Sequence, residues 1–79
     1  MAEIFKYLMR NATVENKIAE LRAEIGLSQE DLANILGYSV GCISSIERGA
    51  ALPTIKSAYV ISKFFGKPIE EIFIFKENL

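Results

Sequence analysis

A single glycine, Gly37, separates two short amphipathic segments in the middle of this chain of 79 residues. Apolar residues recur at helical spacing on both sides of it, so both segments favour helix. Glycine adopts positive φ without steric strain, which ends the first helix and lets the second leave at a steep angle. One continuous helix cannot turn a second surface outward in this way. The stretch therefore predicts a helix-turn-helix unit.

The spacing within this unit is specific. Counting from Gln29, the small residue Ala33 follows after four positions and Gly37 after eight. The small side chain permits close approach of the two helices. Ile43 and Ile46 follow after fourteen and seventeen positions, where they anchor the second helix from below. The combination is far more specific than a glycine turn alone.

Capping residues and glycines divide the rest of the chain into short helices. The expected helices span residues 16–25, 28–36, 39–48 and 54–65, with a short fifth opening at Pro68. Strand patterning is nearly absent, so the fold class is all-α. The residues expected to face inward are Leu32, Ile35, Leu36, Ile43, Ile46, Ile55, Ala58, Tyr59, Ile61, Ser62 and Phe65.

Both ends carry apolar residues outside these helices. Residues 3–12 place several apolar side chains on one helical side, and the C-terminal stretch IFIFKENL alternates loosely, which is compatible with a short strand. A chain this short has a small core, so we expect the ends to complete that core or to pack across a homodimer. The expected organisation is an amphipathic extension at 1–15, a helix-turn-helix domain at 16–73 and a tail at 74–79.

The composition removes most enzyme classes. The chain has no histidine and one cysteine, Cys42, so it offers no set of zinc ligands, no histidine-assisted catalysis and no internal disulfide. No apolar run approaches the ~20 residues of a membrane helix, and charges at Glu3, Lys6 and Arg10 interrupt any signal-peptide core. We therefore expect a cytoplasmic protein that is not an enzyme, without cofactor, membrane contact or small-molecule ligand.

The helix-turn-helix and its flanks resemble the Cro and phage-repressor type of regulators, the Xre-like family, over about Ile18 to Phe73. The matching segments are LR at 21–22, GLSQEDLA at 26–33, LGYS at 36–39, ISSIERG at 43–49, PTIKSA at 53–58 and IEEIF at 69–73. The resemblance implies a five-helix, lambda-repressor-like domain whose third helix, Ser39 to Arg48, docks in the major groove of double-stranded DNA. It also implies a prokaryotic or phage protein that binds a palindromic operator as a homodimer, with half-sites about 34 Å apart.

Roles of individual residues follow from the same resemblance. Gln29 is expected to touch phosphate and to brace the residues that read the bases. The implied base readers are Val40, Gly41, Ser44 and Ser45. The implied phosphate contacts are Ser28, Thr54 and Lys56 at the starts of the second and fourth helices, Ser39 at the start of the third, and the cations Arg48 and Lys17. An ion pair of Arg22 with Glu47 is implied as the structural support of the third helix, which makes Glu47 a structural rather than a catalytic residue.

Two of the implied base readers depart from the family pattern. Val40 and Gly41 stand where relatives often have glutamine, arginine or serine, and neither side chain can hydrogen-bond a base. Val40 is expected to contact a thymine methyl, while Ser44 or Ser45 can bond either base type, but no residue offers a bidentate pair. We therefore expect DNA shape and dimer spacing to supply a larger share of the specificity. In the alternative, Val40 merely covers the start of its helix.

The net charge of −1 leaves a second function class open, because DNA-binding proteins are usually basic. With few cations near the expected phosphates, DNA binding should depend only weakly on salt. The rival to a transcriptional regulator, repressing by default, is a protein-interaction module that kept the fold and lost DNA readout. An enzyme ranks third, because Cys42 has no histidine to activate it. Cys42 is either a redox-sensitive thiol or a small side chain near the groove.

Overall fold

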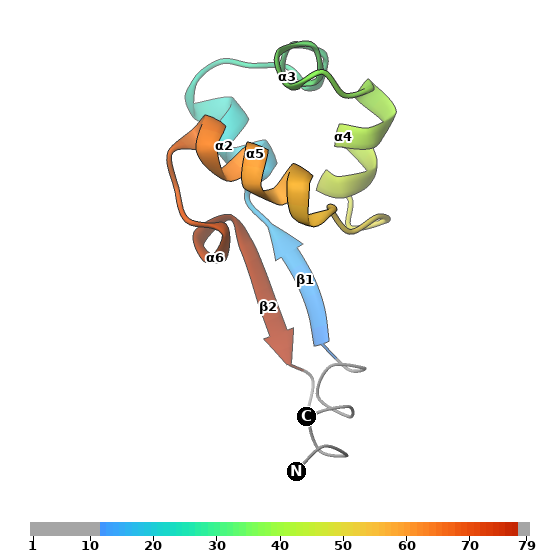
Figure 1. Cartoon of the computed structure of the whole chain (residues 1–79), viewed down its shortest axis with the longest axis vertical. Helices are drawn as coiled ribbons and strands as arrows, with labels where there is room; N and C mark the ends of the chain where they lie inside the picture. Colours follow the sequence, from blue (N-terminus) through green and yellow to red (C-terminus); the bar gives the residue numbers. More distant parts are fainter. Residues whose placement is uncertain (1–11, 78–79) are drawn as a thin grey trace.

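The computed structural model describes residues 12–77, which form five helices and two strands (Figure 1). In chain order these are β1 (Ala12–Asn16), α2 (Ile18–Glu24), α3 (Gln29–Leu36), α4 (Val40–Glu47), α5 (Ile55–Phe65), α6 (Ile69–Ile72) and β2 (Phe73–Glu77). The five expected helices are confirmed, each beginning one or two residues late because a capping residue lies outside its helix. None of the helices in this part of the chain is long and apolar enough to cross a membrane.

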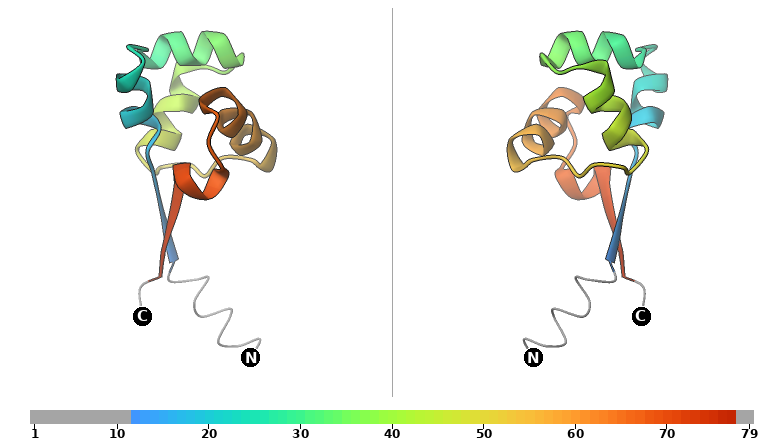
Figure 2. Two further views of the ribbon diagram at one scale, coloured as in Figure 1. Left: turned by 90° about the vertical axis from the view of Figure 1, so that its left-hand side faces the viewer. Right: turned by 90° about the vertical axis from the view of Figure 1, so that its right-hand side faces the viewer.

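The helices form one end of the molecule and the strands project from it. In Figure 1, α2, α3, α4 and α5 surround a common centre, and β1 and β2 run away from it side by side. Figure 2 shows the two strands from both sides as a narrow stalk, with α3 lying across the opposite end of the molecule. The helix-turn-helix formed by α3 and α4 is therefore distant from the outer ends of the strands.

The two strands pair in antiparallel orientation, with Val14 opposite Phe75 and Asn16 opposite Phe73. The C-terminal strand agrees with the alternation in its sequence. The sequence pattern does not predict β1, because it favours an N-terminal helical extension and a first helix that begins at Asn16. Five residues are too few to show a period, and β1 pairs with the other end of the chain, so its conformation depends on tertiary context. The predicted helical stretch 3–12 lies outside the described residues, except for Ala12 in β1.

Asn16 connects β1 to two of the helices. Its side-chain oxygen accepts a hydrogen bond from the backbone N–H of Ile18 at 3.2 Å, and its side-chain nitrogen donates to the carbonyl of Ile46 at 2.9 Å. Lys17, the residue just before α2, provides no side-chain cap. Asn16 therefore caps α2 from outside it and ties the sheet to the C-terminal half of α4.

Each helix contributes one completely buried aliphatic side chain to a single core. These side chains are Ile18 of α2, Leu32 of α3, Ile43 of α4, Ile61 of α5 and Ile72 of α6. Leu21, Ala33, Ile46, Ala58 and Phe73 complete the core. Because α4 is anchored in a core that all the other helices share, its orientation is defined by the whole domain rather than by α3 alone.

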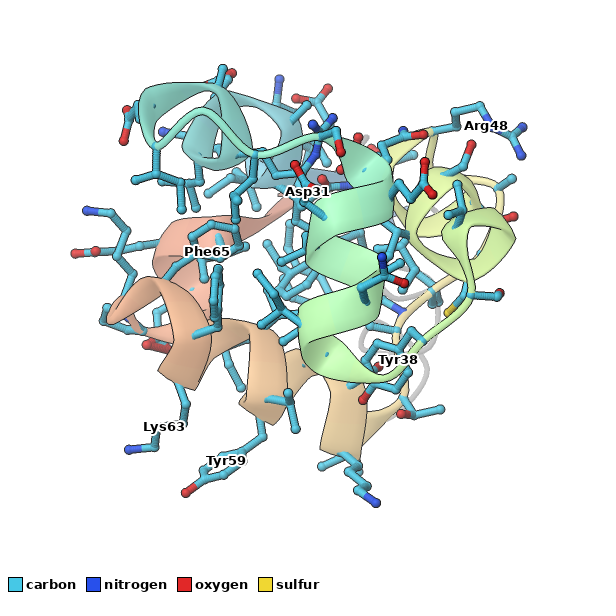
Figure 3. All side chains as sticks on the ribbon, turned by 90° about the horizontal axis from the view of Figure 1, so that it is seen from above. Asp31, Tyr38, Arg48, Tyr59, Lys63 and Phe65 are labelled. Atoms are coloured by element: carbon cyan, nitrogen blue, oxygen red, sulfur yellow. The ribbon has the colours of Figure 1, made fainter. Side chains whose placement is uncertain are left out.

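Three side chains expected to face inward are exposed, so these predictions are wrong. They are Ile35 of α3 and Ile55 and Tyr59 of α5. Each short helix buries one narrow stripe, which passes through Leu32 and Ala33 in α3 and through Ala58 and Ile61 in α5. The three exposed residues lie outside these stripes, and Figure 3 shows Tyr59 pointing away from the helices. Apolar side chains at the surface are common, so periodicity over two turns does not distinguish them from core residues.

Candidate nucleic-acid interface

The turn between α3 and α4 sets the position of α4. α3 ends at Gly37, whose φ of 76° lies in the left-handed region that favours glycine. The backbone N–H of Tyr38 donates to the carbonyl of Ala33 at 2.9 Å, and the side chain of Ser39 then accepts from the backbone N–H of Cys42 at 3.0 Å. Ala33 is buried and small, which lets the two helices approach closely. α4 therefore leaves α3 steeply and lies along one edge of the helical end (Figure 1).

α4 has a buried side and an exposed side. Its two isoleucines belong to the core. Val40, which is 42% exposed, and Gly41 lie on the accessible side, and Ser44 and Ser45 are half-buried one turn further on. The four implied base readers thus lie on one helix, and the two that lack polar side chains are the most accessible.

Arg48 follows α4 and folds back along it. Its Nε donates to Oγ of Ser44 at 3.3 Å, and its Nη2 donates to Oγ of Ser45 at 3.5 Å. Figure 3 shows the guanidinium group at the rim of the molecule beside α4. The exposed cation expected at a phosphate is therefore held next to two implied base readers, and it adds positive potential there although the chain as a whole is negative.

A polar network joins α2, the start of α3 and the end of α4. Arg22 donates to Glu47 through Nε to Oε2 at 2.6 Å and through Nη2 to Oε1 at 2.9 Å, and its Nη1 donates to the carbonyl of Leu27 at 2.8 Å. The side chains of Arg22 and Glu47 are 15% and 7% exposed. Gln29 adds a bond from Nε2 to Oε1 of Glu47 at 3.0 Å, which sequence reasoning missed. The network fixes the end of α4 relative to the two preceding helices.

The network also shifts the pKa values of its charged members. Burial alone raises the pKa of Glu47, but the hydrogen bonds from Arg22 and Gln29 and the nearby positive charge outweigh it, so the pKa of Glu47 is lowered. The hydrogen bond to Glu47 raises the pKa of Arg22. Glu47 therefore stays ionised at neutral pH.

Replacing Glu47 with glutamine should make the free energy of unfolding depend less on pH in the acid range. A carboxylate whose pKa is lowered on folding contributes stability above its unfolded value, near 4.5, and loses that contribution as pH falls through the folded value. We expect E47Q to be less stable than the wild type at pH 7, with the difference shrinking as the pH falls below the unfolded value of Glu47 and through its lower folded pKa. Urea unfolding at four pH values measures this, with the exposed neighbour Glu30→Gln as control. A difference that stays constant with pH would contradict the shift.

The starts of α3 and α5 differ in charge. The first turn of α3 contains Glu30 and Asp31, and the carboxylate of Asp31 accepts from the backbone N–H of Ser28 at 3.1 Å, a bond that lowers the pKa of Asp31. The first turn of α5 contains no acidic residue and includes Lys56 after the cap Thr54. Acidic side chains already occupy the positive end of α3. The start of α5 is therefore the better of the two for binding phosphate.

Lys17 lies apart from the other implied phosphate contacts. It lines a polar hollow formed by α2, α6 and neighbouring residues. The charged residues that share this hollow are Glu20, Glu24, Lys67, Glu70 and Glu71. The four glutamates create a negative potential that disfavours phosphate. The structure thus groups Arg48 with the base readers but does not group Lys17 with them.

An apolar groove lies where the sheet meets the start of α5. Its volume is about 270 Å³, and most of its lining is apolar, including Val14, Leu52, Ile55, Ile69, Phe73 and Phe75. Ile55 is 92% exposed and Phe75 is 61% exposed. Sequence reasoning expects apolar surface at the chain ends but not this groove, because it is assembled from both strands, α6, the start of α5 and the loop before it.

Cys42 is exposed and free. Within residues 12–77, no group of three acidic or cysteine side chains lies close enough together to hold a metal ion. The two alternatives for Cys42, a redox-sensitive thiol or a small side chain near the groove, both stay predictions. α4 and the residue after it offer hydroxyl groups, apolar surface, one thiol and one cation.

Comparison with known proteins gives consistent matches. The helix-turn-helix family matches residues 18–72. An uncharacterized HTH-type transcriptional regulator from Methanocaldococcus jannaschii is 46% identical over 65 residues, which cover 82% of this chain and 98% of that protein. The HTH-type transcriptional activator BcrR from Enterococcus faecalis is 41% identical over 56 residues, 71% of this chain and 28% of BcrR. The cryptic phage CTXphi transcriptional repressor RstR from Vibrio cholerae is 35% identical over 57 residues, 72% of this chain and 51% of RstR.

Proposed function

This chain belongs to the helix-turn-helix family of transcriptional regulators, of the Cro and phage-repressor type, and on that premise we propose that it binds a palindromic DNA operator as a homodimer in the cytoplasm. Residues 16–73 form the DNA-binding domain, and α4 enters the major groove. The main support for this function is the way α4 is held. The core and the Arg22–Glu47 pair fix its inner side, while its outer side is accessible.

Base readout in this proposal depends on apolar contact and single hydrogen bonds. Val40 contacts the methyl group of a thymine, and the hydroxyls of Ser44 and Ser45 bond to base edges. None of these contacts is bidentate, so discrimination at each base pair is modest. The remaining specificity comes from the deformability of the operator and from the fixed distance between two α4 helices.

Phosphate contacts in this proposal flank α4 on both sides. Arg48 binds phosphate on one side, and Thr54 and Lys56 bind phosphate at the start of α5. The side-chain nitrogen of Gln29 carries two hydrogens, of which one is donated to Glu47 and the other remains for a phosphate oxygen. Ser28 and Ser39 contribute through the backbone N–H groups of the helices that they cap.

The homodimer in this proposal forms when a second copy covers the apolar groove. Thr54 at the start of α5 is also at the edge of the groove, so in this proposal the second copy covers the apolar part of the groove and leaves the backbone N–H groups at the start of α5 to phosphate. Ile55 and Phe75 line the groove and are largely exposed, so they offer apolar surface to a second copy, and two identical surfaces can meet about a two-fold axis. A small domain also gains stability from burying this surface.

Repression is the proposed outcome of operator binding. A dimer bound to an operator that overlaps a promoter would occlude the polymerase, and repression follows from such occlusion without any further contact. RstR carries the name of a repressor and BcrR that of an activator. A reporter gene placed behind the selected operator distinguishes the two outcomes, because repression lowers its expression and activation raises it.

Selection of bound duplexes from a random pool tests the proposed function. We expect enrichment of a palindrome whose half-sites lie about 34 Å apart, bound with a dissociation constant of about 10⁻⁸ M or tighter at moderate salt. Light scattering on the same sample should report two chains per operator. Failure to enrich any sequence at low and moderate salt would overturn the proposal.

Replacing Val40 with glutamine is expected to change the selected operator at one position in each half-site. Glutamine reads adenine through a bidentate pair, whereas valine contacts only a thymine methyl, so adenine should replace the wild-type base and affinity for the wild-type operator should fall about tenfold. The matched control is Ile35→Gln, an exposed aliphatic residue on α3. Identical selection by V40Q and wild type would mean that Val40 only covers the start of α4.

A protein-interaction module is the second candidate. It is favoured by Glu30 and Asp31, which place negative charge at the start of α3, where the family implies a phosphate contact. In that case the apolar groove binds a protein partner and α4 has lost its readout. A gel shift with genomic fragments separates the two candidates, because specific retention supports the regulator and the absence of retention at every salt concentration supports the module.

A further inference from the structure

Gly41 is the second residue of α4, and its backbone is that of an ordinary helix. The glycines with positive φ are Gly26, Gly37, Gly49 and Gly66, and Gly41 is not among them. Glycine is the least favourable residue inside a helix after proline. Its presence at this position therefore serves no turn and weakens the helix that carries the base readers.

Packing within the chain does not require glycine here either. A Cβ atom built at Gly41 meets only Oγ of Ser39, at 3.9 Å, which is an ordinary van der Waals contact. The position is exposed. Alanine would therefore fit the free protein and would favour helix at α4. Neither a turn nor packing within the described residues accounts for the missing side chain.

We propose that Gly41 is a specificity-determining residue, because the operator approaches the backbone of α4 too closely at this point for a Cβ atom to fit. This inference rests on the proposed function. The absent side chain leaves a notch on the exposed side of α4, with Val40 beside it and Ser44 one turn further along the same side. The notch fixes how deeply α4 sits in the major groove and which base edge it meets.

Val40 and Ser44 together indicate the kind of base that faces the notch. Oγ of Ser44 accepts a hydrogen bond from Nε of Arg48, so the hydroxyl keeps its hydrogen and one lone pair for a base edge. Because the hydroxyl can donate or accept, it does not by itself select the base. Val40 adds an apolar surface, and thymine presents a 5-methyl group in the major groove beside its O4 acceptor. The notch is thus suited to a thymine, with the methyl group against Val40 and O4 within reach of Ser44.

The variant Gly41→Ala should move stability and DNA binding in opposite directions. We expect its melting temperature to rise by a few degrees, because alanine favours helix. Its affinity for the wild-type operator should fall at least tenfold, and its selected sequence should change at the base pair that faces the notch. If Gly41 had only a structural role, the DNA affinity of G41A would rise with its stability or stay unchanged. The control Asn34→Ala also replaces an exposed helical residue by a better helix former, on α3, and should keep the wild-type sequence.

Base substitution in the operator tests the notch on the wild-type protein itself. Uracil in place of each thymine in turn removes only the methyl group, and we expect a three- to tenfold loss of affinity at one position per half-site. G41A should not distinguish thymine from uracil at that position.

The outcomes separate this inference from the proposed function. If the wild type enriches no sequence, both are overturned. If the wild type enriches a palindrome and G41A binds it with equal affinity, only the role of Gly41 is overturned. Tolerance of uracil at every position would overturn the thymine contact of Val40 as well.

Discussion

Replacing Arg22 with alanine is expected to lower the free energy of unfolding by about 3–5 kcal/mol. The substitution leaves the carboxylate of Glu47, only 7% exposed, without its cation, and removes a bond to the carbonyl of Leu27. The partly buried carboxylate keeps only the bond from Gln29, and the limited access of water does not fully replace the two hydrogen bonds lost with Arg22. In a domain of this size the loss should lower the melting temperature by more than about 10 °C. Thermal and urea unfolding at pH 7 measure both quantities.

The control for this prediction is the exposed ion pair of the sheet. Lys76 and Glu15 lie 3.1 Å apart with more than half of each side chain exposed, so Lys76→Ala should change stability by no more than about 1 kcal/mol. The double variant Arg22→Met with Glu47→Leu removes both charges and should recover much of the loss. An R22A protein as stable as K76A would contradict the role assigned to the pair.

Replacing Phe75 with lysine is expected to abolish the dimer and to reduce affinity for the full palindrome at least a hundredfold. Phe75 is 61% exposed in the groove, so the monomer should remain folded, while a charge in the apolar interface loses its hydration when a second copy binds. Two linked half-sites bind far more tightly than one, so the palindrome suffers and a single half-site does not. Analytical ultracentrifugation and gel shift measure the two effects.

Lysine is chosen because a positive charge cannot weaken DNA binding by repulsion of phosphate. The matched control is Tyr59→Lys, since Tyr59 is an exposed aromatic residue on α5 that does not line the groove. Y59K should remain dimeric and should bind the palindrome as the wild type does. A dimeric F75K protein would show that the two copies meet elsewhere.

The helix-turn-helix was predictable because its signals are local. Serine caps, a glycine at the turn and apolar residues a few positions apart define α3 and α4 without reference to the rest of the chain. β1 was not predictable in this way, because only pairing with β2 makes its five residues a strand. The exposure of Ile35 and Ile55 also depends on neighbours, since a helix of two or three turns contains apolar residues on more than one side.

Only part of the candidate site was likewise predictable from the sequence. The resemblance to a family places Arg22 opposite Glu47 and assigns roles along α4 from aligned positions alone. Aligned positions do not predict contacts that depend on the folded structure. Examples are the bond from Gln29 to Glu47, the hydrogen bond from Arg48 to Ser44 and the position of Lys17 among glutamates. The groove is the extreme case, because its lining residues come from both strands, α6, the start of α5 and the loop before it, and have no common spacing.

The exposed side of α4 is expected to contact a DNA duplex. The most direct measurement is a titration of the isotope-labelled full chain with the selected operator, following backbone amide chemical shifts. If α4 binds the duplex, the largest changes in amide chemical shift should cluster at residues 39–48, with smaller changes at the starts of α3 and α5. Unchanged amides throughout α4, with changes confined to other elements, would contradict it.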